Sequence, residues 1–145
     1  MSNAIVWFRR DLRLADNPAL EAALAEHSHV VPVYVHSPED DGEWRAGAAS
    51  RWWLHHSLAS LDASLRQHGS RLVILRGPVL DALTRLARST GAGTVRWNRV
   101  YDPDGIARDT RVKDALRERG FEAESTNGSL LFEPWTVKTG GGDPY

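Results

Sequence analysis

Cysteine is absent from the sequence, which excludes both a disulfide framework and a metal site built from thiolates. No apolar run approaches the length that crosses a membrane, and the N-terminus lacks the apolar core of a signal peptide. We therefore expect a cytoplasmic location and no membrane partner.

An excess of charge of one sign is also absent, because 18 Lys and Arg face 19 Asp and Glu. This balance argues against nucleic-acid binding driven by bulk charge, although it leaves room for a local basic patch. The phosphate-binding signatures GxGxxG, GxxxxGK(S/T) and SGGxDS do not occur. Their absence disfavours an ordinary dinucleotide site or an ATP-hydrolysing site.

The sequence does contain a regular alternation of strand-like and helix-like segments. Short apolar runs at residues 4–8, 30–35, 72–75, 94–97 and 122–126 suit strands that are buried on both faces of a parallel sheet. Helical segments separate these runs, and 145 residues suffice for one domain. The pattern predicts an α/β fold with an open, doubly wound, five-stranded parallel sheet flanked by helices, which is a Rossmann-like architecture.

The first helix is predicted over residues 16–27. Asp16 or Asn17 is expected to cap its free amides, and Pro18 suits its first turn. Leu20 and Leu24 lie one turn apart, and we expect both on the inner face. Two later helices are expected to end near glycines, with their apolar positions at Leu80, Leu83 and Leu86 before Gly91, and at Val112 and Leu116 before Gly120.

The longest helix is predicted between Gly47 and Gly69. Its inner face is expected to combine Leu58, Leu61 and Leu65 with either Trp53 or Leu54. Because adjacent helical residues diverge by about 100°, we expect one of Trp52 and Trp53 in the core and the other at a ligand crevice or a neighbouring domain. For the same reason, the adjacent His55 and His56 cannot chelate one metal and are expected to be solvated.

A charged segment, Arg9, Arg10, Asp11 and Arg13, follows the first predicted strand. Ligands of such sheets bind at the carboxyl ends of the strands, so these side chains are candidates to bind an anion. The alternative is that they pair with carboxylates and hold the loops together. Because side chains alternate along an extended chain, we expect one of Arg9 and Arg10 to enter the crevice. The other is expected to turn toward the helices or the acidic loop, with Asp102 or Asp109 as a partner.

Turn-forming residues follow the fourth predicted strand, in the sequence DPDG at residues 102–105. Asp102, Asp104 and Asp109 suggest a cluster of carboxylates. The same residues are typical of a turn, in which Pro103 and Gly105 set the backbone and Asp104 caps a helix.

Four motifs together resemble the photolyase/cryptochrome family of flavoproteins. They are IVWFRRDLRLADNPAL, GAASRWWLHHSLASLDASLRQHGSRL, VRWNRVYDPDGIARD and SLLFEPWTV, and the closing GGGDPY is similar to a stretch that leads into the family's next domain. The segments RWWLHHSLASLD and LLFEPW look most like the branch that includes plant cryptochromes and related bacterial photolyases. The resemblance covers nearly the whole chain.

The resemblance implies an N-terminal antenna-binding α/β domain at residues 1–134 and the start of an interdomain linker at 135–145. In the family, a C-terminal helical domain binds FAD and damaged DNA, and the complete protein is a DNA-repair lyase acting on cyclobutane pyrimidine dimers, or a cryptochrome. That domain is absent here, so this chain alone is expected to be inactive. The apolar residues Leu130, Leu131, Phe132 and Trp135 would meet the helical domain, and if exposed they are expected to promote self-association.

The family's α/β domain holds an antenna chromophore, either a folate (methenyltetrahydrofolate) or a deazaflavin or flavin, that passes excitation energy to FAD. The resemblance places its contacts at Arg9, Arg10, Tyr34, Val35, His36, Glu43, Ser50, Arg51, Leu54, Asp102 and Gly105. The family's best-known folate-binding branch has Asn-Glu where this chain has Asp104-Gly105, and His where it has Trp44. Gly105 leaves room for a flat ring deeper in the domain, while Glu43 suits a second folate geometry of the plant-like branch. An alternative without light chemistry is a stand-alone α/β module that binds a nucleotide-like ligand or a partner protein.

Overall fold

The computed structural model of the chain describes residues 3–9, 12, 14, 17–37, 48–100 and 103–126, with only the backbone described for 48–50. Five parallel strands form one sheet in the order β3-β2-β1-β4-β5. The strands are β1 (Asn3–Phe8), β2 (His29–His36), β3 (Val73–Arg76), β4 (Thr94–Asn98) and β5 (Glu122–Thr126). Every predicted strand is present, and each predicted boundary lies within one residue of the observed one.

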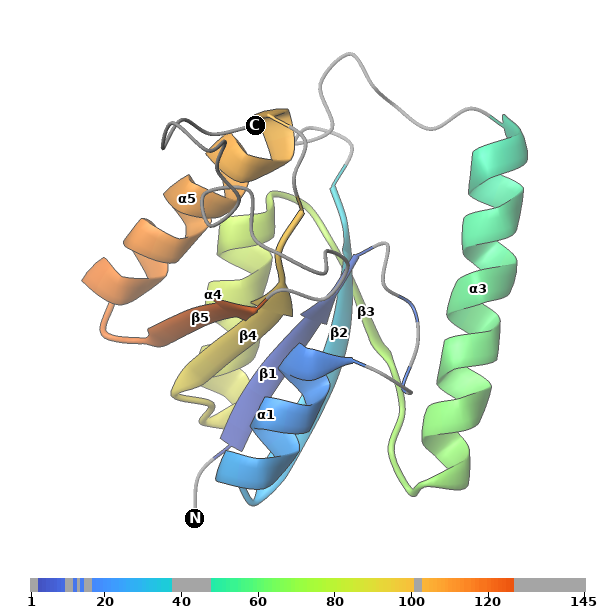
Figure 1. The fold of residues 1–145 in the computed structure, drawn as a ribbon, viewed down its shortest axis with the longest axis horizontal. Helices are drawn as coiled ribbons and strands as arrows, with labels where there is room; N and C mark the ends of the chain where they lie inside the picture. Colours follow the sequence, from blue (N-terminus) through green and yellow to red (C-terminus); the bar gives the residue numbers. More distant parts are fainter. Residues whose placement is uncertain are drawn as a thin grey trace, which may run out of the picture.

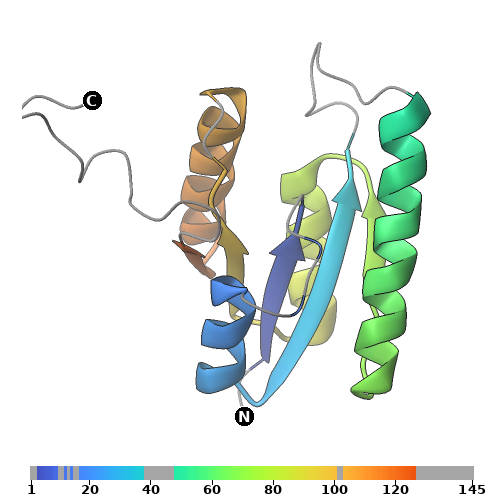
Figure 2. The same ribbon diagram turned by 45° about the vertical axis from the view of Figure 1, so that its right-hand side comes forward.

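Helices cover both faces of the sheet, as the doubly wound prediction required. The described helices are α1 (Pro18–Glu26), α3 (Ala48–Gln67), α4 (Val79–Thr90) and α5 (Pro103–Glu118). In Figure 1, α1 lies in front of the sheet and α4 behind it, while α3 runs alongside β2 and β3 in both Figure 1 and Figure 2. The chain moves outward from β1 to β3, then crosses to β4 on the other side of β1. This reversal puts the later helices on the opposite face, because parallel crossovers are right-handed.

Two apolar clusters, one on each face, follow from the alternation of side chains along the strands. In β1, Ala4, Val6 and Phe8 pack with α1 and α3, whereas Ile5 and Trp7 pack with α4 and α5. β1 is therefore buried on both faces, which explains why the first predicted strand is an uninterrupted apolar run.

The helix ends follow the capping residues that the sequence provides. Asn17 caps α1 by accepting a hydrogen bond from the Leu20 amide at 3.2 Å, and Pro18 occupies the first position of the helix. Gly91 ends α4 with a left-handed φ of 72°, a conformation that other residues rarely adopt. α5 begins at Pro103, which puts Asp104 inside its first turn rather than at the predicted cap position.

Leu24 was expected on the inner face of α1, and this prediction is wrong, because Leu24 is 61% exposed. The buried residues of α1 are Ala19, Leu20 and Ala23. Ala23 rather than Leu24 therefore continues the inner face one turn after Leu20. Two alanines on this face let the short helix approach the sheet closely.

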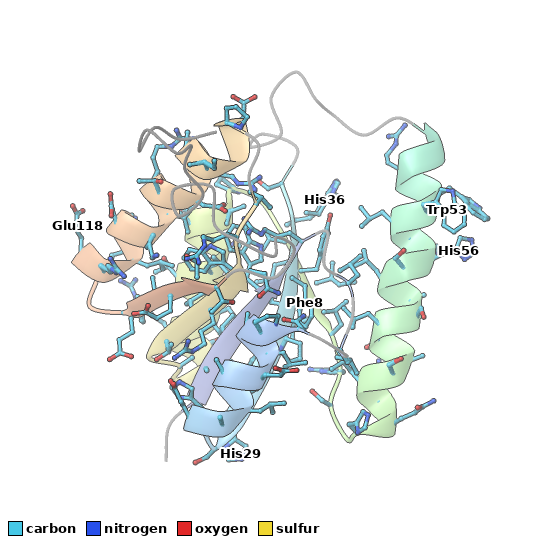
Figure 3. The ribbon with its side chains drawn as sticks, in the orientation of Figure 1. Phe8, His29, His36, Trp53, His56 and Glu118 are labelled. Carbon is cyan, nitrogen blue, oxygen red and sulfur yellow. The ribbon has the colours of Figure 1, made fainter. Side chains whose placement is uncertain are left out.

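The expectation that Trp52 or Trp53 packs in the core is also wrong, because they are 57% and 66% exposed. Their rings instead contact each other at 5.3 Å between centroids. The inner stripe of α3 begins at the half-buried Leu54 and continues through Leu58, Leu61 and Leu65, and both tryptophans lie about 100–200° around the helix from it. Figure 3 shows Trp53 and His56 on the side of α3 that points away from the sheet. His55 and His56 are exposed, as predicted.

Asp62 ties the C-terminal half of α3 to the chain that enters β3. Its carboxylate accepts hydrogen bonds from Arg66 Nε at 2.8 Å and from the Leu72 amide at 2.9 Å. These two hydrogen bonds, that from Arg66 first, lower the pKa of Asp62 below its ordinary value. Leu72 is buried, so this carboxylate holds in place the residue that begins the return to the sheet.

Replacing Asp62 by asparagine should lower the free energy of unfolding at neutral pH, because the amide cannot replace the ionised acceptor. Since the folded-state pKa is depressed, this stabilisation is complete above the unfolded pKa of about 3.9. It is lost as the pH falls through the folded pKa. Chemical denaturation between pH about 7 and about 3 should therefore show the wild type and Asp62→Asn converging in acid. Glu118→Gln, which removes an exposed carboxylate, is the control, and a difference that persisted unchanged into acid would contradict this account.

Candidate functional site

The strand order places a switch point between β1 and β4, the two strands from which the chain runs in opposite directions across the sheet. Their carboxyl ends carry Phe8 and Arg9 on one side and Asn98 and Arg99 on the other. In open α/β sheets, ligands bind outside the strand ends at this position. The charged segment after the first strand therefore lies where a ligand crevice is expected.

Arg9 forms a buried ion pair with Asp109 of α5. Its Nη1 donates to both carboxylate oxygens of Asp109 at 2.6 Å, and its Nη2 donates to the backbone carbonyl of Asn98. The side chains of Arg9 and Asp109 are only 9% and 12% exposed. The prediction that Asp102 or Asp109 pairs with one of the two arginines is thus confirmed for Asp109 and Arg9. A second arginine, Arg108, lies near the same carboxylate, with its Nε 3.4 Å from Oδ1.

Trp7 supplies an aromatic surface for the same guanidinium. The Arg9 Cζ atom lies 4.5 Å from the centroid of the Trp7 ring, and Arg108 Cζ lies 5.8 Å from it. Trp97 of β4 packs edge-on against Trp7, with 5.5 Å between the centroids. Alternation explains this arrangement, because Arg9 follows Ile5 and Trp7 on the face that α4 and α5 cover.

Asn98, the last residue of β4, connects three elements through its side chain. Its Nδ2 donates to Asn17 Oδ1 at 2.7 Å, and its Oδ1 accepts from the Ala19 amide at 3.0 Å and from the Thr126 hydroxyl at 2.9 Å. The N-terminus of α1 and the end of β5 are therefore both fixed to the end of β4. Asn98 was not among the predicted site residues. The available signal was an amide side chain directly after an apolar strand, where a buried polar group needs partners.

The predicted ligand residues on β2 divide between the two faces of the sheet. Tyr34 lies beside Phe8 in the strand register and packs against the cluster that α1 and α3 cover. Val35 is buried in the opposite cluster, so its side chain faces α4. His36 is half-buried at the end of β2, on the same side as Tyr34 by alternation.

The other predicted residues come from α3 and α5. Leu54 is half-buried on the inner stripe of α3, and Arg51, one turn earlier, is exposed. Gly105 is buried in the first turn of α5. Arg10, Glu43 and Asp102 lie outside the described residues, as do the apolar residues at 130–132 and Trp135, and the side chain of Ser50 is not described.

The described polar groups at the switch point are engaged with one another. The one carboxylate placed there among the described residues, Asp109, accepts from Arg9 and Arg108 and is thereby neutralised. No group of three or more potential metal ligands occurs within the described ranges. No helix in that part of the chain is long and apolar enough to span a membrane. The arrangement holds the ends of β1, β4 and α5 in a fixed geometry around a prospective ligand.

Comparison with known proteins gives a consistent result over nearly the whole chain. The chain is 47% identical over 142 residues to cryptochrome-2 of Arabidopsis thaliana, a match that covers 97% of this chain and 23% of that protein. It superposes on a class III photolyase from Agrobacterium tumefaciens with a TM-score of 0.92 and 46% identity, covering 99% of this chain and 29% of that one. A photolyase from Sulfolobus tokodaii gives a TM-score of 0.83 at 30% identity, covering 94% of this chain and 32% of that one.

The chain thus spans about a quarter to a third of the length of these relatives. Nothing in the comparisons supports the alternative of a stand-alone module without light chemistry. The five-stranded parallel sheet with helices on both faces matches the N-terminal α/β domain of the photolyase structures. Residues 4–145 match the family described as DNA photolyase, and the chain belongs to that family.

Proposed function

We propose that this chain is the antenna-binding domain of a light-driven DNA-repair photolyase or of a cryptochrome. The observation that supports this most strongly is the family match, which extends across residues 4–145. The archaeal photolyase among the neighbours was solved with two FAD molecules, and its description infers a novel light-harvesting cofactor. A second pigment in a structural neighbour supports an antenna role for this fold.

In this proposal, residues 1–134 form the domain and residues 135–145 begin the linker to a helical domain that binds FAD. That helical domain is the principal partner, and the complete protein acts on damaged DNA from a cytoplasmic location. Relatives with these names are three to four times longer than the chain, which is consistent with a further domain. The residues Leu130, Leu131, Phe132 and Trp135 would then face that domain, and self-association through them stays a prediction.

The described side chains near the ends of β1 and β2 suit a planar pigment with an anionic tail. Tyr34 and Leu54 offer aromatic and apolar surface, and His36 adds a polar edge. Arg51 provides an exposed cation on the same side of the sheet, suited to a glutamyl or phosphate group. When bound, the pigment absorbs light and passes the excitation energy to FAD. A folate and a deazaflavin or flavin both fit this set of contacts.

Arg9 enters the proposal as a positioning residue rather than a pigment contact. Its guanidinium already donates to Asp109 and to the Asn98 carbonyl and lies against Trp7. Direct contact with the pigment is assigned instead to Arg10, Glu43, Ser50, Asp102 and Gly105, together with the residues of β2 and α3 named above. Gly105, buried in the first turn of α5, has no side chain that would obstruct a ring.

Replacing Arg51 by methionine should weaken pigment binding about tenfold or more, because a charge-assisted hydrogen bond contributes about 1.5–3 kcal/mol. Titration of the chain with methenyltetrahydrofolate and, separately, with FMN would measure this through the pigment's absorbance and fluorescence. Arg88→Met removes an exposed cation from α4 on the other face and should leave both affinities unchanged. Equal weakening by the two variants would point to general charge rather than to this site.

Replacing Arg9 by methionine should lower the free energy of unfolding by about 3–5 kcal/mol, because the buried carboxylate of Asp109 then keeps only the more distant Arg108 as a cation. Replacing both partners, as in Arg9→Met with Asp109→Leu, should recover part of this loss, since no buried charge is then left unpaired. Denaturant unfolding measures both. Intact stability of Arg9→Met together with reduced pigment affinity would instead make Arg9 a ligand contact.

The chain alone should show no light-dependent reversal of thymine dimers and should not retain FAD, because both activities are assigned to the helical domain. Irradiated oligonucleotide, blue light and a full-length photolyase as the positive control suffice for this measurement. Repair above background by the chain alone would overturn the assignment of this activity to the helical domain.

A further inference from the structure

A separate pocket of about 270 Å³ lies between the end of β4, α5 and β5. Trp97, Val100 and Ile106 form its apolar wall, while Lys113 and Ser125 contribute to its polar wall. Trp97 belongs to the apolar cluster that α4 and α5 cover. The pocket therefore lies on the opposite face of the sheet from α3, whose side chains line the proposed pigment site.

Two cations converge on Ser125 at the polar wall of this pocket. Lys113 Nζ donates to the Ser125 hydroxyl at 3.1 Å, and Arg99 Nη1 lies 3.2 Å from the Ser125 carbonyl and 3.4 Å from its hydroxyl. Within the described part of the chain, no carboxylate forms an ion pair with Lys113. Partial burial lowers the pKa of Lys113, and repulsion from Arg117 and Arg99 lowers it further, against weaker opposition from Glu124 and Asp114.

Two carboxylates near the pocket, Asp109 and Glu124, are engaged by cations other than Lys113. Asp109, at the pocket wall, accepts from Arg9 and Arg108. Glu124 on β5 lies 3.9 Å from Arg117. Among the described residues that line the pocket, Lys113 and Arg99 thus lie at one end and apolar side chains at the other.

We propose that this pocket binds a small organic anion, with its carboxylate or phosphate group at Lys113 and Arg99 and its apolar body against Val100 and Ile106. Such an anion would give Lys113 the opposite charge that the described chain does not provide. A volume of about 270 Å³ is just below the usual range of ligand pockets, about 300–1,000 Å³. The ligand is thus comparable in size to a substituted benzene ring, and a folate or a dinucleotide exceeds the pocket. The proposal does not depend on pigment binding.

NMR titration of the chain with benzoate and with phenyl phosphate tests this proposal, with benzyl alcohol as the neutral counterpart. Both anions should shift the amide signals of Thr110, Lys113 and Ser125 saturably, and the alcohol should bind at least tenfold more weakly. Lys113→Met should weaken the anions at least tenfold. Arg111→Met removes an exposed cation from the same helix, outside the pocket wall, and should leave the affinity unchanged.

Two further measurements keep the result independent of any folding defect in Lys113→Met. Ile106→Trp, at a position that is 47% exposed, should fill the pocket and abolish binding. Benzoate keeps its charge above pH about 6, so its affinity for the wild type should fall as Lys113 deprotonates in the alkaline range, whereas Lys113→Met should lack this fall.

The proposal is overturned by absence of saturable shifts, by equal affinity of the alcohol, or by unchanged affinity in Lys113→Met or Ile106→Trp. Equal weakening by Arg111→Met also overturns it, because general surface charge would then account for binding.

Discussion

The geometry of the switch point depends on one guanidinium, which is buried at the end of the central strand. Arg9 directly follows β1, donates to Asp109 on α5 and to the Asn98 carbonyl at the end of β4, and lies against the Trp7 ring. Stranding such a charge costs several kcal/mol, whereas full pairing removes most of that cost. Only one relative placement of β1, β4 and α5 satisfies all of these contacts at once. The pair therefore specifies the geometry of the strand ends more than it adds to net stability.

Asn98 extends this constraint to the rest of the sheet's carboxyl edge. Its carbonyl accepts from Arg9, while its side chain binds Asn17 and the Ala19 amide at the start of α1 and Thr126 at the end of β5. Four elements thus meet at one residue through bonds that are buried or partly buried. Because the ends of β1 and β4 and the first turns of α1 and α5 are held before any ligand arrives, binding there would require little further ordering.

The sequence predicted the elements of this fold well because their signals are local. Apolar runs indicate the strands. Asn17 and Pro18 indicate the start of α1, and Gly91 indicates the end of α4, because capping and backbone conformation depend on residues only a few positions apart. The Arg9–Asp109 pair could also be anticipated, because a charge after a buried strand needs a partner of opposite charge. The loop and helix start after the fourth strand contain few carboxylates that could supply it.

The incorrect predictions concern burial, which depends on packing between elements that are distant in the sequence. Helical periodicity alone does not say which stripe faces the sheet, so Leu24 and one of the two tryptophans were predicted to be buried, although Leu24, Trp52 and Trp53 are all exposed. The role of Asn98 depends on β4 lying next to β1, with α1 across their ends, and these adjacencies come from a strand order that no local pattern encodes. At the candidate ligand site, the sequence indicated which residues follow each strand. It did not indicate that Val35 and Tyr34 face opposite apolar clusters, because that depends on how β2 packs in the sheet.

Alternation along β1 also determines which face of the sheet Arg9 supports. Arg9 continues the face of Ile5 and Trp7 and is bound to Asp109 of α5, so it supports the switch point from the face that α4 and α5 cover. The same pairing determines the charge of the pocket beside α5. Asp109 lines that pocket, and its carboxylate would balance Lys113 if Arg9 did not already neutralise it. One ion pair thus orders the switch point on one side and, within the described residues, engages the carboxylate of the pocket wall that would otherwise be available to Lys113 on the other.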